Sequence, residues 1–144
     1  MIRVALPLIV LVTTLVACGG SDSSPAGPTP VAVPFSSTDL VVGTGAEATN
    51  GKTLTVNYTL WLYSASAADH KGSQVQTTVG GQPFQFTLGA GRVIAGWDQG
   101  VPGMKVGGRR ELVIPPSLGY GAAAQPGIPA NSTLVFDIDL LGVQ

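Results

Sequence analysis

The chain is poor in the residues from which most chemical sites are built. Its 144 residues include one cysteine and one histidine, which excludes an intrachain disulfide and a conventional structural zinc site. Charged residues make up only 10% of the chain, and the formal net charge is −1. Because no basic surface is available to hold a phosphate backbone, nucleic acid is not expected as a partner.

Glycine and proline are abundant instead, with 20 and 11 residues. Both disfavour helix interiors, so the composition favours a turn-rich β fold over a helical bundle. The segment from Gly45 to Thr53 superficially resembles a phosphate-binding loop. It has one residue too many between its glycines, and a strand pattern rather than a helix follows it, so we reject that interpretation. No dinucleotide-binding glycine motif occurs, and we expect no cofactor.

The first residues have the design of a bacterial lipoprotein signal peptide, predicted over residues 1–17. Arg3 precedes an apolar run from Val4 to Ala17, shorter than the roughly 20 apolar residues that span a bilayer. The run ends in Leu15-Val16-Ala17-Cys18, which resembles the lipobox, and Cys18 is the only cysteine. We therefore expect lipidation of Cys18 and anchoring of an exported protein at a membrane, on the periplasmic face or the cell surface. An ordinary signal peptide is the alternative.

Residues 18–34 form a predicted spacer between this anchor and a folded domain. The segment is rich in glycine, serine and proline and carries one charge, which is typical of a flexible linker. The remaining residues, 35–144, are enough for one independent core.

Alternating apolar residues predict strands in this domain. The predicted strands cover residues 52–63, 83–88, 109–114 and 133–141, with a weaker candidate at 38–42. A single helix is predicted over residues 93–101, where Ile94, Trp97 and Val101 form an apolar stripe before Pro102 and Gly103. Residues 64–72 are interpreted as an exposed loop. The predicted class is α+β, with antiparallel strands packed on one short helix.

The polar residues do not form a recognisable catalytic group. His70 lies in the predicted loop without a motif around it, which favours a solvated histidine over a member of a triad. Asp137 and Asp139 alternate onto the polar face of a strand, where solvated carboxylates are expected. Asp98 and Glu111 have no partner that the sequence identifies. We therefore expect no nucleophile and no metal site.

Aromatic residues are the more prominent feature. Tyr58, Phe84, Phe86, Trp97 and Phe136 fall on inward faces of the predicted elements, where aromatic side chains are usually part of the core. Tyr120 departs from this pattern, because it lies between two glycines in an irregular segment.

At these positions the sequence resembles the FKBP-type peptidyl-prolyl cis-trans isomerases, from about Thr38 to Val143. The motifs that carry the resemblance are Val56-Asn57-Tyr58-Thr59, Pro83-Phe84-Gln85-Phe86-Thr87-Leu88-Gly89, Val93-Ile94-Ala95-Gly96-Trp97-Asp98-Gln99-Gly100-Val101, Met104-Lys105-Val106-Gly107-Gly108, Ile114-Pro115-Pro116, Leu118-Gly119-Tyr120-Gly121, Pro126-Gly127-Ile128-Pro129 and Thr133-Leu134-Val135-Phe136.

The resemblance implies a half-open, twisted antiparallel sheet of four to six strands wrapped on one short helix. It also implies that the active site is an apolar pocket. The residues it assigns to that pocket are Tyr58, Phe84, Val93, Ile94, Trp97, Tyr120 and Phe136. Trp97 would form the floor and the Ile94 backbone N–H would hold a substrate carbonyl, with Val75, Gln76 and Ile128 at the rim. The sequence departs from the family at Val75 and Gln76, where phenylalanine and aspartate are common.

The function implied by the resemblance is prolyl isomerisation during the folding of exported proteins. Its partners would be unfolded or extended chains that contain proline, macrolides of the rapamycin class, and the membrane through the lipid anchor. A low-activity binding or chaperone module of the same fold is the alternative, and Val75-Gln76 is the feature that separates the two.

Overall fold

Residues 32–144 are described in the computed structural model of this chain. The predicted signal peptide, Cys18 and most of the predicted spacer lie outside the described residues. Within residues 32–144, no helix has the length and apolar character required to cross a bilayer.

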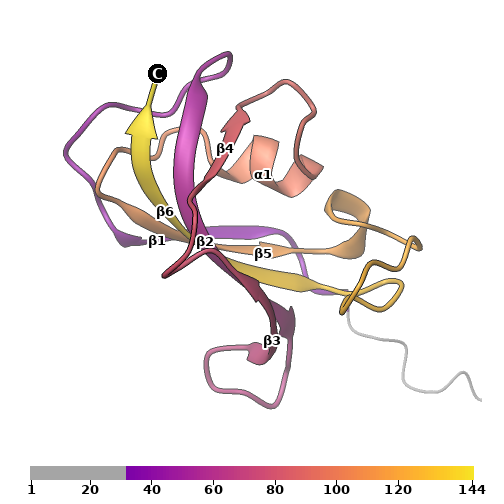
Figure 1. Ribbon diagram of the computed structural model, residues 1–144. Helices are drawn as coiled ribbons and strands as arrows, with labels where there is room; N and C mark the ends of the chain where they lie inside the picture. Colours follow the sequence, from indigo (N-terminus) through magenta and orange to yellow (C-terminus); the bar gives the residue numbers. More distant parts are fainter. Residues whose placement is uncertain (1–31) are drawn as a thin grey trace, which may run out of the picture. The chain divides into compact units, whose positions relative to one another are not determined.

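The described residues form a six-stranded antiparallel sheet and one short α-helix (Figure 1). Its elements are β1 (Ser36–Val41), β2 (Thr53–Tyr63), β3 (Lys71–Thr77), β4 (Phe84–Thr87), α1 (Ala95–Gly100), β5 (Arg109–Ile114), the 3₁₀ turn η1 (Pro116–Leu118) and β6 (Leu134–Val143). The strand order is β1-β5-β6-β2-β3, and β4 also pairs with β2. The predicted α+β class and the predicted sheet are confirmed.

Strand β2 organises the sheet because it has neighbours along both edges. One edge pairs with β6 over most of its length. The other edge is divided: residues 53–56 pair with β4, whereas residues 59–63 pair with β3. Tyr58 lies at the point where β3 and β4 separate. There its N–H donates to the Thr78 hydroxyl at 3.0 Å, and its carbonyl accepts from the Thr78 N–H at 3.0 Å. The sheet therefore opens at Tyr58.

One strand was not predicted: β3 occupies Lys71–Thr77 and overlaps the end of the predicted loop at residues 64–72. Its side chains are mostly exposed on both faces, so no apolar alternation marks it in the sequence. The strand forms because pairing with β2 satisfies its backbone groups, which is a long-range effect that a local pattern does not report. The segment before it contains His70, which has a positive φ of 58° and stacks on Tyr63 at 5.1 Å.

Helix α1 packs closely on β5 through two glycines (Figure 1). A Cβ at Gly96 would lie 2.7 Å from the side chain of Ile114, and one at Gly100 would lie 2.6 Å from that of Leu112. Larger residues would hold the helix away from the sheet. The helix is shorter than predicted: Ile94 is its N-cap residue rather than part of its first turn.

The polar face of the sheet is held by ion pairs rather than left to solvent, which corrects the sequence interpretation of its carboxylates. Lys71 Nζ lies 2.8 Å from Asp137 and 3.1 Å from Glu111, and 4.8 Å from the ring centroid of Trp61. Asp139 pairs with Arg109 at 2.7 Å. Burial lowers the pKa of Lys71, but hydrogen bonds and the charges of the two carboxylates outweigh it and leave the pKa above its ordinary value.

Candidate active site

The opening beside Tyr58 contains a cavity of about 140 Å³. Its walls come from β2, β3, β4, α1, β6 and the loops before α1 and after η1. The residues that line it are Tyr58, Leu60, Gln76, Phe84, Arg92, Val93, Ile94, Trp97, Tyr120 and Phe136. All seven residues that the resemblance assigns to the pocket therefore lie around one cavity, together with Gln76.

Trp97 lines this cavity and is 3% exposed. Four aromatic rings pack around its indole: the centroid of Tyr58 lies 5.2 Å away, those of Phe86 and Phe136 lie 5.3 Å away, and that of Phe84 lies 6.1 Å away. All four contacts are edge-to-face, the geometry that aromatic quadrupoles prefer. Because four rings pack against it, the indole has little freedom to move within the cavity lining.

Two phenols, those of Tyr58 and Tyr120, line the cavity. Burial raises the pKa of Tyr58 above its ordinary value, and the neighbouring Tyr120 raises it further. The Tyr58 hydroxyl therefore stays protonated near neutral pH and can donate a hydrogen bond. Tyr120 is 37% exposed, like Phe84, so it lines the open side of the cavity rather than the core. This placement agrees with its position in an irregular segment.

The start of α1 supplies a backbone donor at the cavity wall. The carbonyl of Ile94 accepts hydrogen bonds from Trp97 and Asp98, but the Ile94 N–H has no partner among residues 32–144. Asp98, which had no partner identified from sequence, accepts the Gly89 N–H at 3.0 Å and so links α1 to the preceding loop. A free N–H beside an apolar floor can bind the carbonyl of a ligand.

Two of the three rim residues expected from the resemblance lie away from the cavity lining. Val75 is half-buried and packs against the core, and its Cγ1 lies 3.2 Å from the position that a Cβ of Gly127 would take. Ile128 is 6% exposed and belongs to the core. These residues therefore support the loop around Gly127, whereas Gln76 reaches the cavity. Of the three expected rim residues, Gln76 is the one that lines the cavity directly.

Sequence reasoning missed two lining residues, Leu60 and Arg92. Leu60 lies two residues after Tyr58 on the same face of β2 and is 3% exposed, so its sequence pattern is that of an ordinary core residue. Arg92 lies in a loop whose glycines, Gly89 and Gly91, have positive φ values of 78° and 69°. Nothing in the local pattern indicates where such a loop directs its arginine.

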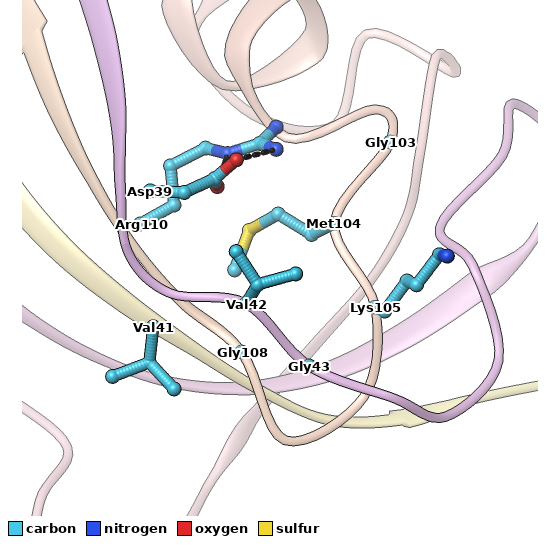
Figure 2. Close-up of a pocket in the computed structure, with 9 residues that line it drawn as sticks. All are labelled: Asp39, Val41, Val42, Gly43, Gly103, Met104, Lys105, Gly108 and Arg110. Atoms are coloured by element: carbon cyan, nitrogen blue, oxygen red, sulfur yellow. Dashed lines mark hydrogen bonds and ion pairs between the residues drawn. The ribbon is translucent and has the colours of Figure 1, made fainter.

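A smaller second cavity, of about 60 Å³, lies between the end of β1 and the loop after α1 (Figure 2). It contains none of the candidate residues. At one side Asp39 accepts hydrogen bonds from the guanidinium of Arg110, which also donates to the carbonyls of Gly100 and Pro102. Arg110 thus ties β1 and the end of α1 to β5.

The large cavity offers mainly aromatic and aliphatic surface to a ligand. Its walls contain aromatic rings, aliphatic side chains, two phenols, one amide and one guanidinium. Within the part of the chain that the structure describes, no group of three or more His, Cys, Asp or Glu side chains could hold a metal ion. The fold and the site together define a half-open antiparallel sheet with an aromatic cavity at its opening.

Comparison with known proteins identifies the family. Residues 45–141 match the profile described as FKBP-type peptidyl-prolyl cis-trans isomerase, and the chain belongs to this enzyme family. It is 46% identical over 106 residues to an FK506-binding protein of Neisseria meningitidis serogroup A, covering 73% of this chain and 92% of that protein. It is also 43% identical over 123 residues to FK506-binding protein 4 of Gibberella zeae, covering 85% of this chain but only 23% of the fungal protein.

Solved structures show the same fold. The crystal structure of AtFKBP13 superposes with a TM-score of 0.64 at 36% identity, covering 76% of this chain and 93% of that one. The crystal structure of FkpA from Escherichia coli also gives a TM-score of 0.64, at 40% identity, covering 76% of this chain and 48% of that one.

Proposed function

We propose that this protein catalyses cis-trans isomerisation of X–Pro bonds in exported polypeptides, and that the aromatic cavity is the site where it does so. The observation that supports this most directly is the cavity itself. Its lining includes the indole of Trp97 and the residue Ile94, whose N–H has no partner among residues 32–144. These groups match what isomerisation of an amide requires.

The reaction needs no bond to break. Its barrier, about 18–20 kcal/mol, arises from amide resonance that is lost when the C–N bond twists. A catalyst must therefore bind the twisted amide more tightly than the planar one. The twisted amide is less charge-separated than the planar form, so an apolar cavity favours it.

We assign the substrate groups to the cavity as follows. The proline ring packs on Trp97, and the Ile94 N–H donates to a carbonyl of the peptide. The Tyr58 and Tyr120 hydroxyls lie at the open side as neutral donors. When the proline ring and one carbonyl are held in place, rotation about the X–Pro bond is the motion that remains. This positioning of the peptide lowers the barrier to isomerisation.

A prolyl-isomerisation assay tests this proposal. Tyr120→Ala should lower kcat/KM about tenfold, since removing an aromatic wall from a partly open cavity costs about 1–2 kcal/mol. The matched control is Tyr63→Ala, which removes a tyrosine stacked on His70, outside the cavity lining. It should leave the rate unchanged. A wild-type chain with no detectable rate would favour the alternative, a binding or chaperone module of the same fold.

Ligand binding gives a second readout of the same cavity. The relatives are named FK506-binding proteins, and we propose that this cavity also accepts macrolides of that kind, including the rapamycin class. Binding should change the fluorescence of Trp97. The other tryptophan, Trp61, lies on the polar face beneath Lys71, so a Trp61→Phe background isolates the signal. An unchanged spectrum at high micromolar ligand would contradict the assignment of Trp97.

The proposal also includes the location of the protein in the cell. The signal-peptide pattern at residues 1–17 and the single Cys18 support export and lipid anchoring at a membrane, with residues 18–34 as a spacer. Clients would then be extended or unfolded chains outside the cytoplasm, where slow X–Pro isomerisation limits folding.

A further inference from the structure

Arg92 is the one charged side chain among the ten residues that line the aromatic cavity. The rest of the lining is aromatic or aliphatic, apart from the neutral amide of Gln76. No carboxylate lines the cavity, so its formal charge is positive. An apolar site with a single guanidinium at its wall discriminates between ligands by the charge they carry near that group.

The guanidinium of Arg92 is available to a ligand. Among residues 32–144, the ion pairs involve Lys71, Arg109 and Arg110, and Arg92 forms neither an ion pair nor a side-chain hydrogen bond. Asp98, the acidic residue in the first turn of α1, accepts the Gly89 N–H instead. Arg92 itself is exposed.

The loop that carries Arg92 is held in place relative to the site. The Gly89 N–H donates a hydrogen bond to the Asp98 carboxylate at 3.0 Å, and this contact holds the loop against α1. Arg92 lies two residues before Ile94, which lines the same cavity and whose N–H has no partner among residues 32–144. A peptide whose carbonyl is bound by Ile94 therefore places the side chains that flank the carbonyl close to the guanidinium.

We propose that Arg92 is a specificity-determining residue that favours peptides with an acidic side chain next to the proline. The inference rests on the proposed isomerase function and names the substrate class of that site. A glutamate or aspartate there can accept two parallel hydrogen bonds from the guanidinium. Because Arg92 is exposed, the expected preference for glutamate over glutamine is modest, about threefold to fivefold.

The test measures kcat/KM of the full chain on capped peptides that differ only at the residue before or the residue after the proline. Glutamate is compared with its neutral isostere glutamine at each place, at low ionic strength. We expect the glutamate peptide to be preferred about threefold to fivefold in at least one of the two places. The preference should disappear in Arg92→Gln and weaken at high salt.

Lys105→Gln is the matched control. Lys105 is also exposed and without an ion pair, but it lines the small second cavity rather than the aromatic one. The variant changes the net charge equally and should keep the preference. Equal rates on glutamate and glutamine peptides at both places, or a preference that survives Arg92→Gln, would overturn the inference while leaving isomerase activity intact.

If no peptide is isomerised, the proposed function fails, and the inference is still decided by binding. The same peptides are then titrated against Trp97 fluorescence in the Trp61→Phe background. A tighter dissociation constant for the glutamate peptide that depends on Arg92 supports the assignment, and equal constants overturn it.

Discussion

Replacing Gly96 with alanine should destabilise the fold and disturb the floor of the cavity. A Cβ at this position would lie 2.7 Å from Cδ1 and Cγ2 of Ile114 and 2.8 Å from its Cγ1. Favourable carbon contacts lie at about 3.5–4.0 Å, so α1 and β5 must separate by roughly an ångström. Trp97 follows Gly96 directly in the helix, and the same displacement moves its indole within the ring of aromatic neighbours.

The expected cost follows from two opposing effects. Inserting a methyl group into a packed core costs about 1–3 kcal/mol, whereas alanine is favoured over glycine in a helix interior by about 1 kcal/mol. Because α1 has only six residues, Gly96 lies near a helix end and little of the propensity gain is realised. We therefore expect a net loss of about 1–2 kcal/mol in the free energy of unfolding, together with a lower kcat/KM.

Urea denaturation followed by circular dichroism measures the loss, and two changes at Ile114 test its cause. Ile114→Ala removes all three clashing atoms, whereas Ile114→Val removes only Cδ1. The cost of Gly96→Ala should vanish in the first background and persist in the second. Gly81→Ala is the matched control, since its nearest atom is the Thr78 carbonyl at 3.6 Å, and it should change stability by less than about 0.5 kcal/mol. An equal cost of Gly96→Ala in all backgrounds would refute the steric argument.

Three further outcomes are expected. Hydrogen bonds from Arg110 lower the pKa of Asp39 below its ordinary value of 3.8, so this pair contributes stability above that value and loses it as pH falls through the folded pKa. The free energy of unfolding, measured by urea titration, should therefore fall less between pH 5 and pH 3 in Asp39→Asn than in the wild type. Cys18→Ser should leave the protein unprocessed or released from membranes, and unchanged processing and fractionation would contradict lipidation. Val75→Phe with Gln76→Asp should raise kcat/KM by less than about tenfold, because only Gln76 lines the cavity. The rate should stay flat from pH 6 to 8, and a bell-shaped profile would oppose the twisted-amide mechanism.

The periodicity of apolar residues was sufficient to predict the strands and the helix that bury one face. In β2 and β6 every second residue is apolar, and the burial of Leu54, Val56, Ile138 and Leu140 follows that alternation. The single helix was also predictable, because Trp97 and Val101 lie on one stripe and proline ends it. These signals are local: the period of the backbone decides which side chains share a face.

The family motifs named residues from distant parts of the chain that lie around one cavity. Tyr58 is on β2, Trp97 on α1 and Phe136 on β6, and all three meet at the opening between β3 and β4. The apolar periodicity alone could not show whether these aromatic residues line a pocket or belong to a closed core. Which of the two holds depends on where β3 and β4 separate along β2, and strand pairing decides that position.

Strand β3 and the charged contacts were decided by the tertiary structure. Lys71 reaches Glu111 and Asp137 only because β3, β5 and β6 lie in one sheet, and the sequence showed three unrelated charges. Arg92 likewise gains its place at the cavity from a loop with two left-handed glycines. Such contacts join residues far apart in the chain, so their geometry depends on how the whole sheet closes. The sequence by itself determined which faces of the strands and the helix are apolar, because the chemical nature of each side chain fixes this. The contact partners of the polar and exposed residues were determined only by how the surrounding elements pack.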